Sequence, residues 1–137
     1  MNPYESIFDR AAEASARSLA ESIREVVPRA LLMQIHIEAA RARSTASARG
    51  ISLTVDDCAS PDGVVLSLGG RCVVFWRDAR GIRTWRGAGA GPAMVCTATI
   101  LAGASSAVPL PDSTDAMGTI ASRVIGDAVT FLLSTAS

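Results

Sequence analysis

The sequence predicts an α+β domain built from two N-terminal helices, an antiparallel meander of four to five strands, and a C-terminal helix packed on the sheet. Three observations predict it. Apolar residues recur at helical spacing before residue 50, they alternate with polar residues between 51 and 86, and they return to helical spacing after 113. Helices at both ends of a run of short strands are typical of α+β proteins. The length of 137 residues fits one domain, 1–137.

The first segment reads as a helix over about 3–27. Asn2 and Glu5 have the spacing of a capping box, and Pro3 suits the first helical position. A single stripe of apolar residues advances by three and four, and charged residues lie outside it. The stripe comprises Phe8, Ala12, Ala16, Leu19, Ile23 and Val26. Because alanine permits close helix approach, we expect the N-terminal half to pack against another helix or a second copy of itself.

A second helix is expected over about 29–48. Pro28 disfavours helical geometry at Val27, so it either kinks the first helix or begins a new one. The apolar positions that fit the helical period are Leu32, Ile35, Ala39, Ala42 and Ala46, and Gly50 is placed to stop the helix. Residues 33–37 also alternate as a strand would, so that alternative stays open.

The stretch 51–86 predicts an antiparallel meander. Ile51, Leu53 and Val55 alternate with polar residues, and residues 61–63 form a turn signal before the run 64–68. The pair at 69–70, two glycines, suits a two-residue hairpin that returns through 71–77. Residues 78–81 close a further hairpin onto 82–86. Four short strands follow from this pattern.

The segment 93–103 has no polar face, so periodicity leaves strand and helix open; its Val, Thr and Ile content slightly favours a fifth strand. After Pro109 and Pro111, a helix is expected over about 113–134. One broad apolar face marks it, made of Met117, Ile120, Ala121, Val124, Ala128, Phe131 and Leu132.

Composition excludes several classes of function. Thirteen basic and thirteen acidic residues cancel, so no overall field attracts nucleic acid or membrane. Every basic residue is arginine, which excludes Schiff-base chemistry. Three cysteines without a C-x-x-C pair predict neither a disulfide framework nor a zinc site. The sequence shows no secretory signal and no strongly apolar run of spanning length, so we expect a cytoplasmic protein without a membrane segment.

The predicted hairpins assign side chains to two sheet faces. Leu68 should lie opposite Arg71, and Arg77 opposite Ile82. The first face then carries Ile51, Leu53, Val55, Val64, Leu66, Val73, Phe75 and Ile82, and is the expected core floor. The second carries Val65, Ser67, Cys72, Val74, Trp76, Arg83 and Trp85. Because this second face is too apolar to be left bare, we expect the C-terminal helix, another subunit or a ligand to cover it. Val74, Trp76, Arg83 and Trp85 form the candidate binding surface.

Other residues with reactive side chains lack the spacing that chemistry requires. His36 is the only histidine, and no sequence feature links it to Cys58 or Cys72. Asp56, Asp57 and Asp62 gather in the first hairpin without the spacing of a calcium loop. The glycine-rich run 87–92 matches no phosphate-binding frame. The sequence therefore predicts no catalytic residues, no metal site and no cofactor.

Three functional hypotheses follow. The leading one is a non-enzymatic protein-interaction or adaptor-type domain that self-associates as a homodimer or larger oligomer and can take a protein partner. The alternative is single-stranded nucleic-acid binding through Trp76, Trp85 and the strand arginines Arg71, Arg77, Arg80, Arg83 and Arg86. The zero net charge, and arginines on both faces, argue against that alternative. The third is a small enzyme whose site is assembled from distant residues.

Overall fold

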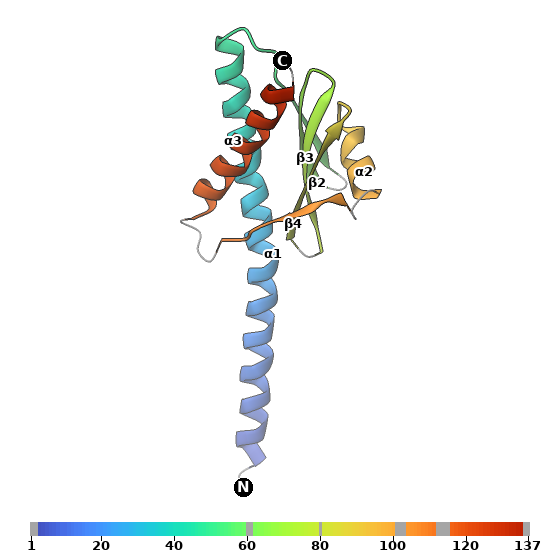
Figure 1. Ribbon diagram of the computed structural model, residues 1–137. Helices are drawn as coiled ribbons and strands as arrows, with labels where there is room; N and C mark the ends of the chain where they lie inside the picture. Colours follow the sequence, from blue (N-terminus) through green and yellow to red (C-terminus); the bar gives the residue numbers. More distant parts are fainter. Residues whose placement is uncertain (1–2, 60–61, 80, 101–103, 112–115, 136–137) are drawn as a thin grey trace.

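The computed structural model describes residues 3–59, 62–79, 81–100, 104–111 and 116–135. Three helices and five strands account for most of these residues. In chain order they are α1 (Pro3–Ala48), β1 (Thr54–Ala59), β2 (Asp62–Leu68), β3 (Arg71–Asp78), β4 (Gly81–Ala88), α2 (Ala93–Ile100), β5 (Ser106–Val108) and α3 (Met117–Thr135). The α+β class is confirmed, with a C-terminal helix packed on an antiparallel sheet (Figure 1).

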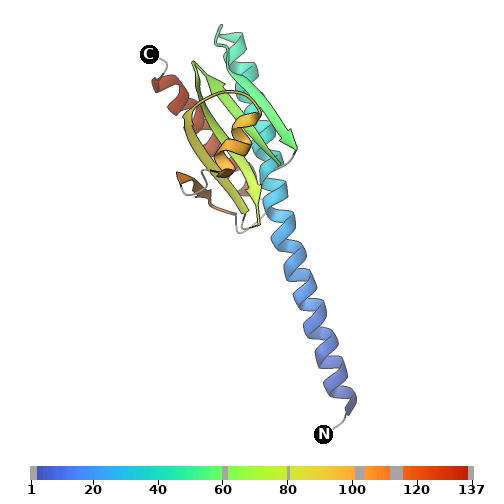
Figure 2. The same ribbon diagram turned by 90° about the vertical axis from the view of Figure 1, so that its right-hand side faces the viewer.

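The two helical segments expected on either side of Pro28 are both helical, and they join as the single helix α1. Its 46 residues correspond to a length of about 69 Å. Pro28 is the first buried residue of α1 among the side chains that the structure describes. The proline therefore lies where the helix meets the rest of the fold. The N-terminal half of α1 extends beyond the sheet, with no other described element beside it in either view (Figures 1 and 2).

The sheet is a meander in the order β1-β2-β3-β4-β5, antiparallel throughout. Leu68 pairs with Arg71 and Arg77 with Ile82, which confirms the predicted register. Gly69 and Gly70 connect β2 to β3 with φ of 62° and 79°, a conformation that glycine adopts without strain. The first strand begins at Thr54, later than the alternation from Ile51 suggested.

The slight preference for a strand over 93–103 was wrong, because residues 93–100 form the helix α2. Residues 101–103 lie outside the described residues. Val95 and Ala98, three residues apart, bury one side of this short helix against the sheet. The fifth strand is β5, which pairs with the edge of β4. A run of small and apolar residues can form either element, and here burial against the sheet decides the outcome.

The fold has three layers, with α1 and α3 on one face of the sheet and α2 on the other (Figures 1 and 2). The larger core occupies the face predicted as the core floor, where Leu53, Val64, Leu66, Val73, Phe75 and Ile82 meet the two long helices. Helix α1 contributes Leu31, Leu32, Ile35 and Ala39, and α3 contributes Ile120, Ala121, Ile125, Ala128 and Leu132. From Leu31 onward, one face of α1 is therefore buried in the core.

Candidate functional site

The second sheet face, predicted as the binding surface, is covered within the chain by α2. Val74 and Trp76 are 0% and 2% exposed, and they pack with Val95 and Ala98 of that helix. Neither the C-terminal helix nor a second subunit is needed to cover them. In this conformation Val74 and Trp76 belong to a small core and do not reach the surface.

Trp85 and Arg83, the other two residues of the predicted surface, are half-buried. Trp85 packs at the edge of the small core, with its ring over Gly87; a Cβ there would come within 2.6 Å of the indole. Arg83 lies opposite Trp76, as predicted, but its guanidinium donates to Ser105, with Nη2 2.7 Å from Oγ and 3.0 Å from the carbonyl oxygen. Arg83 thus fastens β4 to the segment before β5.

The strand arginines do not form one basic platform. Arg86 lies on the opposite face from Arg83, with its guanidinium carbon 4.9 Å from the centre of the Phe131 ring on α3. Arg71 and Arg77 lie at the two ends of β3, and Arg80 lies outside the described residues. A groove for single-stranded nucleic acid needs exposed aromatic rings along a shared basic track. The arrangement of these residues does not provide one.

The structure brings together two residues that no spacing had linked, His36 of α1 and Asp57 of β1. Nδ1 of His36 lies 3.0 Å from Oδ1 of Asp57, beside a hollow that Arg29, Cys58 and Asp62 also line. The carboxylate side chain is 75% exposed. Among the described residues, no three His, Cys, Asp or Glu side chains gather as a metal site would require. The pair joins the long helix to the edge strand.

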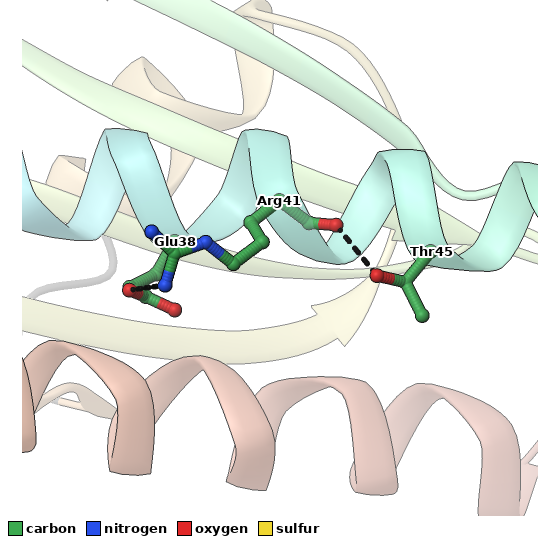
Figure 3. A network of polar contacts seen from close by, with 3 residues as sticks. All are labelled: Glu38, Arg41 and Thr45. Carbon is green, nitrogen blue, oxygen red and sulfur yellow. Dashed lines mark hydrogen bonds and ion pairs between the residues drawn. The ribbon is translucent and has the colours of Figure 1, made fainter.

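An open apolar hollow of about 390 Å³ lies between the C-terminal part of α1 and α3. Ala42, Ala46, Ile51, Leu53, Leu68, Ile125, Val129, Leu132 and Leu133 supply its apolar lining. At its rim, Nη1 of Arg41 donates to the Glu38 carboxylate at 2.8 Å, and the Thr45 hydroxyl donates to the Arg41 carbonyl at 3.0 Å (Figure 3). These polar groups at the rim are therefore hydrogen-bonded to one another, and the lining of the hollow offers mainly apolar contacts.

The least expected surface is the outer face of α1, which carries large apolar side chains that its own chain does not cover. Val26 and Met33 are each 60% exposed and Ile37 is 45% exposed, whereas Leu32 and Ile35 are at most 1% exposed. Residues 26, 33 and 37 therefore lie on the side of the helix that faces away from the core. Large apolar side chains exposed together on one helix face mark a candidate interaction site.

This outer face continues the stripe that the sequence predicted. We define the outer seam as the positions that repeat at alternating steps of four and three along α1: Ala12, Ala16, Leu19, Ile23, Val26, Ala30, Met33, Ile37 and Ala40. Ala12, Ala16 and Ala40 are exposed and Ala30 is half-buried. The repeat averages 3.5 residues, the spacing of a coiled-coil seam. Sequence reasoning found its N-terminal part and missed its continuation past Pro28.

The N-terminal end of α1 adds further exposed apolar side chains. Tyr4, Ile7 and Phe8 are 66%, 59% and 71% exposed. Every described side chain from Pro3 to Arg17 is exposed, and neither view shows another described element beside this part of the helix (Figures 1 and 2). The described helices include none that is both long and apolar enough to cross a bilayer. No protein-family model, curated protein or solved structure matches the chain.

Proposed function

We propose that the protein is a non-enzymatic protein-interaction domain that self-associates through the outer seam of α1. The observation that carries the proposal is the seam itself: nine apolar positions repeat at coiled-coil spacing along α1, and Val26, Met33 and Ile37 among them are exposed. A helix apolar on one stripe normally packs that stripe against its own domain. Helix α1 carries two apolar stripes, and only one of them packs in the core of its own domain.

The protruding half of α1 supports the same function. An isolated helix gains little stability from propensity alone, and most helical stability in proteins comes from packing of an apolar face. Residues 3–17 are helical yet exposed on all sides. Packing against another helix would supply the missing stabilisation, and it would cover the large exposed side chains at Val26, Met33 and Ile37.

The proposal keeps the expectation of a reducing, cytoplasmic compartment. All three cysteines are free thiols, and Cys96 is exposed on α2. Exposed thiols persist in compartments where glutathione and thioredoxin keep them reduced. No disulfide therefore links the elements of the fold.

Two alanine substitutions in the protruding half test the proposal. Ala16 lies on the seam and Ala14 does not, although both are exposed alanines of the same helix. Ala16→Glu would place a carboxylate within the apolar association surface, which costs about 3 kcal/mol or more. A cost of that size weakens association about 100-fold. Ala14→Glu carries the same charge change on the opposite side of the helix.

We expect wild type and Ala14→Glu to have twice the chain mass of 14.2 kDa in light scattering, and Ala16→Glu to have the mass of one chain. Circular dichroism of each variant checks that the domain remains folded. A wild-type protein that stays monomeric at high concentration would refute the proposal. So would equal association of the two variants.

A further inference from the structure

We infer that the partner of α1 is α1 of a second copy of the chain, packed antiparallel, so that residues 16–30 of each helix cover Val26 to Ala40 of the other. This inference rests on the proposed self-association and adds the partner, the direction and the register. Three features of α1 carry it: the opposite charges of its two halves, the layers formed by the seam, and the location of the protruding half.

The two halves of α1 carry opposite net charge. Residues 3–25 contain five acidic residues and three arginines, and residues 26–48 contain three arginines and one glutamate. The formal charges are therefore −2 and +2. An antiparallel pair places each acidic half beside a basic half, whereas a parallel pair places like halves together. The helix dipoles also oppose each other only in the antiparallel pair.

The seam forms complete layers in the antiparallel register. Ala16 meets Ala40, Ile23 meets Met33, and Leu19 meets Ile37, while Val26 and Ala30 meet around the two-fold axis. Alanine pairs at the outer layers let the helix axes approach closely, and the larger residues fill the layers between them. Every seam position from 16 to 40 then has an apolar partner.

The positions beside the seam agree with this direction. In this register Glu13 of one helix comes opposite Arg41 of the other, and both residues are exposed. In a parallel pair these two residues would be separated by 28 positions, about 42 Å along the axis. The antiparallel register also brings Arg29 near its own symmetry mate; both side chains are exposed and can turn apart into solvent.

The shape of the molecule permits the arrangement. The exposed seam residues Val26, Met33 and Ile37 lie on the side of α1 opposite its core face, so the two sheets would lie on the outer sides of the helix pair. Each protruding half extends past its own domain and would lie along the part of the partner's helix that is anchored in the other domain (Figure 1). Both the unsupported half and the uncovered half of the seam are then packed.

Disulfide cross-linking distinguishes the two directions. In a Cys96→Ser background, which removes the exposed native thiol, we would prepare Ala16→Cys and Ala40→Cys separately. The antiparallel register puts residue 16 beside residue 40 of the partner, within reach of a disulfide. It separates residue 16 from its own mate by 24 positions, about 36 Å. We expect a cross-linked dimer under mild oxidation only when the two variants are mixed; the background protein is the control.

The other outcomes of the cross-linking experiment separate a wrong direction or register from a wrong proposed function. Cross-linking of either variant with itself indicates a parallel pair and overturns the inference. No cross-linking in the mixture, while light scattering still shows a dimer, overturns the register and leaves the proposed function intact. A monomer in the Cys96→Ser background refutes the proposed function itself.

Salt provides a second measurement that needs no substitution. Because opposite charges meet in the antiparallel pair, screening should weaken it, and we expect the dimer Kd to rise several-fold between low and moderate NaCl. A parallel pair, with like halves in contact, would tighten as salt screens the repulsion. A Kd that falls with added NaCl would contradict the antiparallel arrangement.

Discussion

Ile35 and Ile37 allow the two faces of α1 to be compared with one chemical change. Ile35 is 0% exposed and packs in the core with Leu31 and Leu32, and Ile37, two residues later, is 45% exposed. Ile35→Ala removes buried carbon atoms and leaves a cavity, which costs about 2 to 5 kcal/mol of unfolding free energy. Ile37→Ala removes atoms that are roughly half hydrated in the single chain, which costs about 1 kcal/mol at most. The better helix propensity of alanine offsets part of that loss.

The assay is urea unfolding followed by tryptophan emission, since Trp76 is buried in the folded protein. With an m-value of about 2 kcal/mol per M, a loss of 3 kcal/mol lowers the midpoint by roughly 1.5 M. At low protein concentration we expect this shift for Ile35→Ala and a much smaller one for Ile37→Ala. At high concentration the wild-type midpoint should rise because association stabilises the folded chain, and Ile37→Ala should lose that gain. Equal midpoints for the two variants at low concentration would refute the assignment of the two faces.

Three further outcomes follow from the same structure. Gly87→Ala brings a Cβ within 2.6 Å of the Trp85 ring and should lower Tm by overpacking. Gly126→Ala in α3 adds a Cβ that has no neighbouring atom within 4 Å, so it should raise Tm through helix propensity. A higher Tm for Gly87→Ala than for Gly126→Ala would contradict this packing. Burial raises the pKa of the Cys72 thiol above its ordinary value, so the unfolded chain loses this proton first and stability should fall as pH rises past the ordinary thiol range. Cys72→Ala should flatten the fall, and labelling should reach Cys96 first. A single-stranded oligonucleotide should leave tryptophan emission unchanged at low salt, because one indole is buried and the other half-buried; strong quenching would revive the nucleic-acid hypothesis.

The meander was predictable because its determinants are local. Gly69 and Gly70 set the turn that pairs β2 with β3, and the hairpin predicted at 78–81 sets the pairing of β3 with β4. Alternation then divides the side chains between the two faces, and the structure has the same division. The location of α2 could not be obtained in this way, since residues 93–100 lack a polar face and only long-range packing selects a helix over them.

The outer seam was only partly predictable for a related reason. From residue 29 onward, two apolar stripes share the same helix, one through Leu32, Ile35 and Ala39 and the other through Met33 and Ile37. Helical spacing accounts for either stripe, and only tertiary contacts show which one the domain buries. Pro28 suggested a boundary between two helices, because the steric bias of proline can be seen in the sequence. The tertiary packing around a helix that continues past Pro28 cannot be seen there.

The proposed association joins copies of this chain through the outer seam of α1. Light scattering of the wild-type protein across a concentration series, with Ala16→Glu measured beside it, tests this association. Wild type should approach twice 14.2 kDa as concentration rises, and Ala16→Glu should remain at 14.2 kDa while folded. A wild-type mass of 14.2 kDa at every concentration would contradict the proposed association.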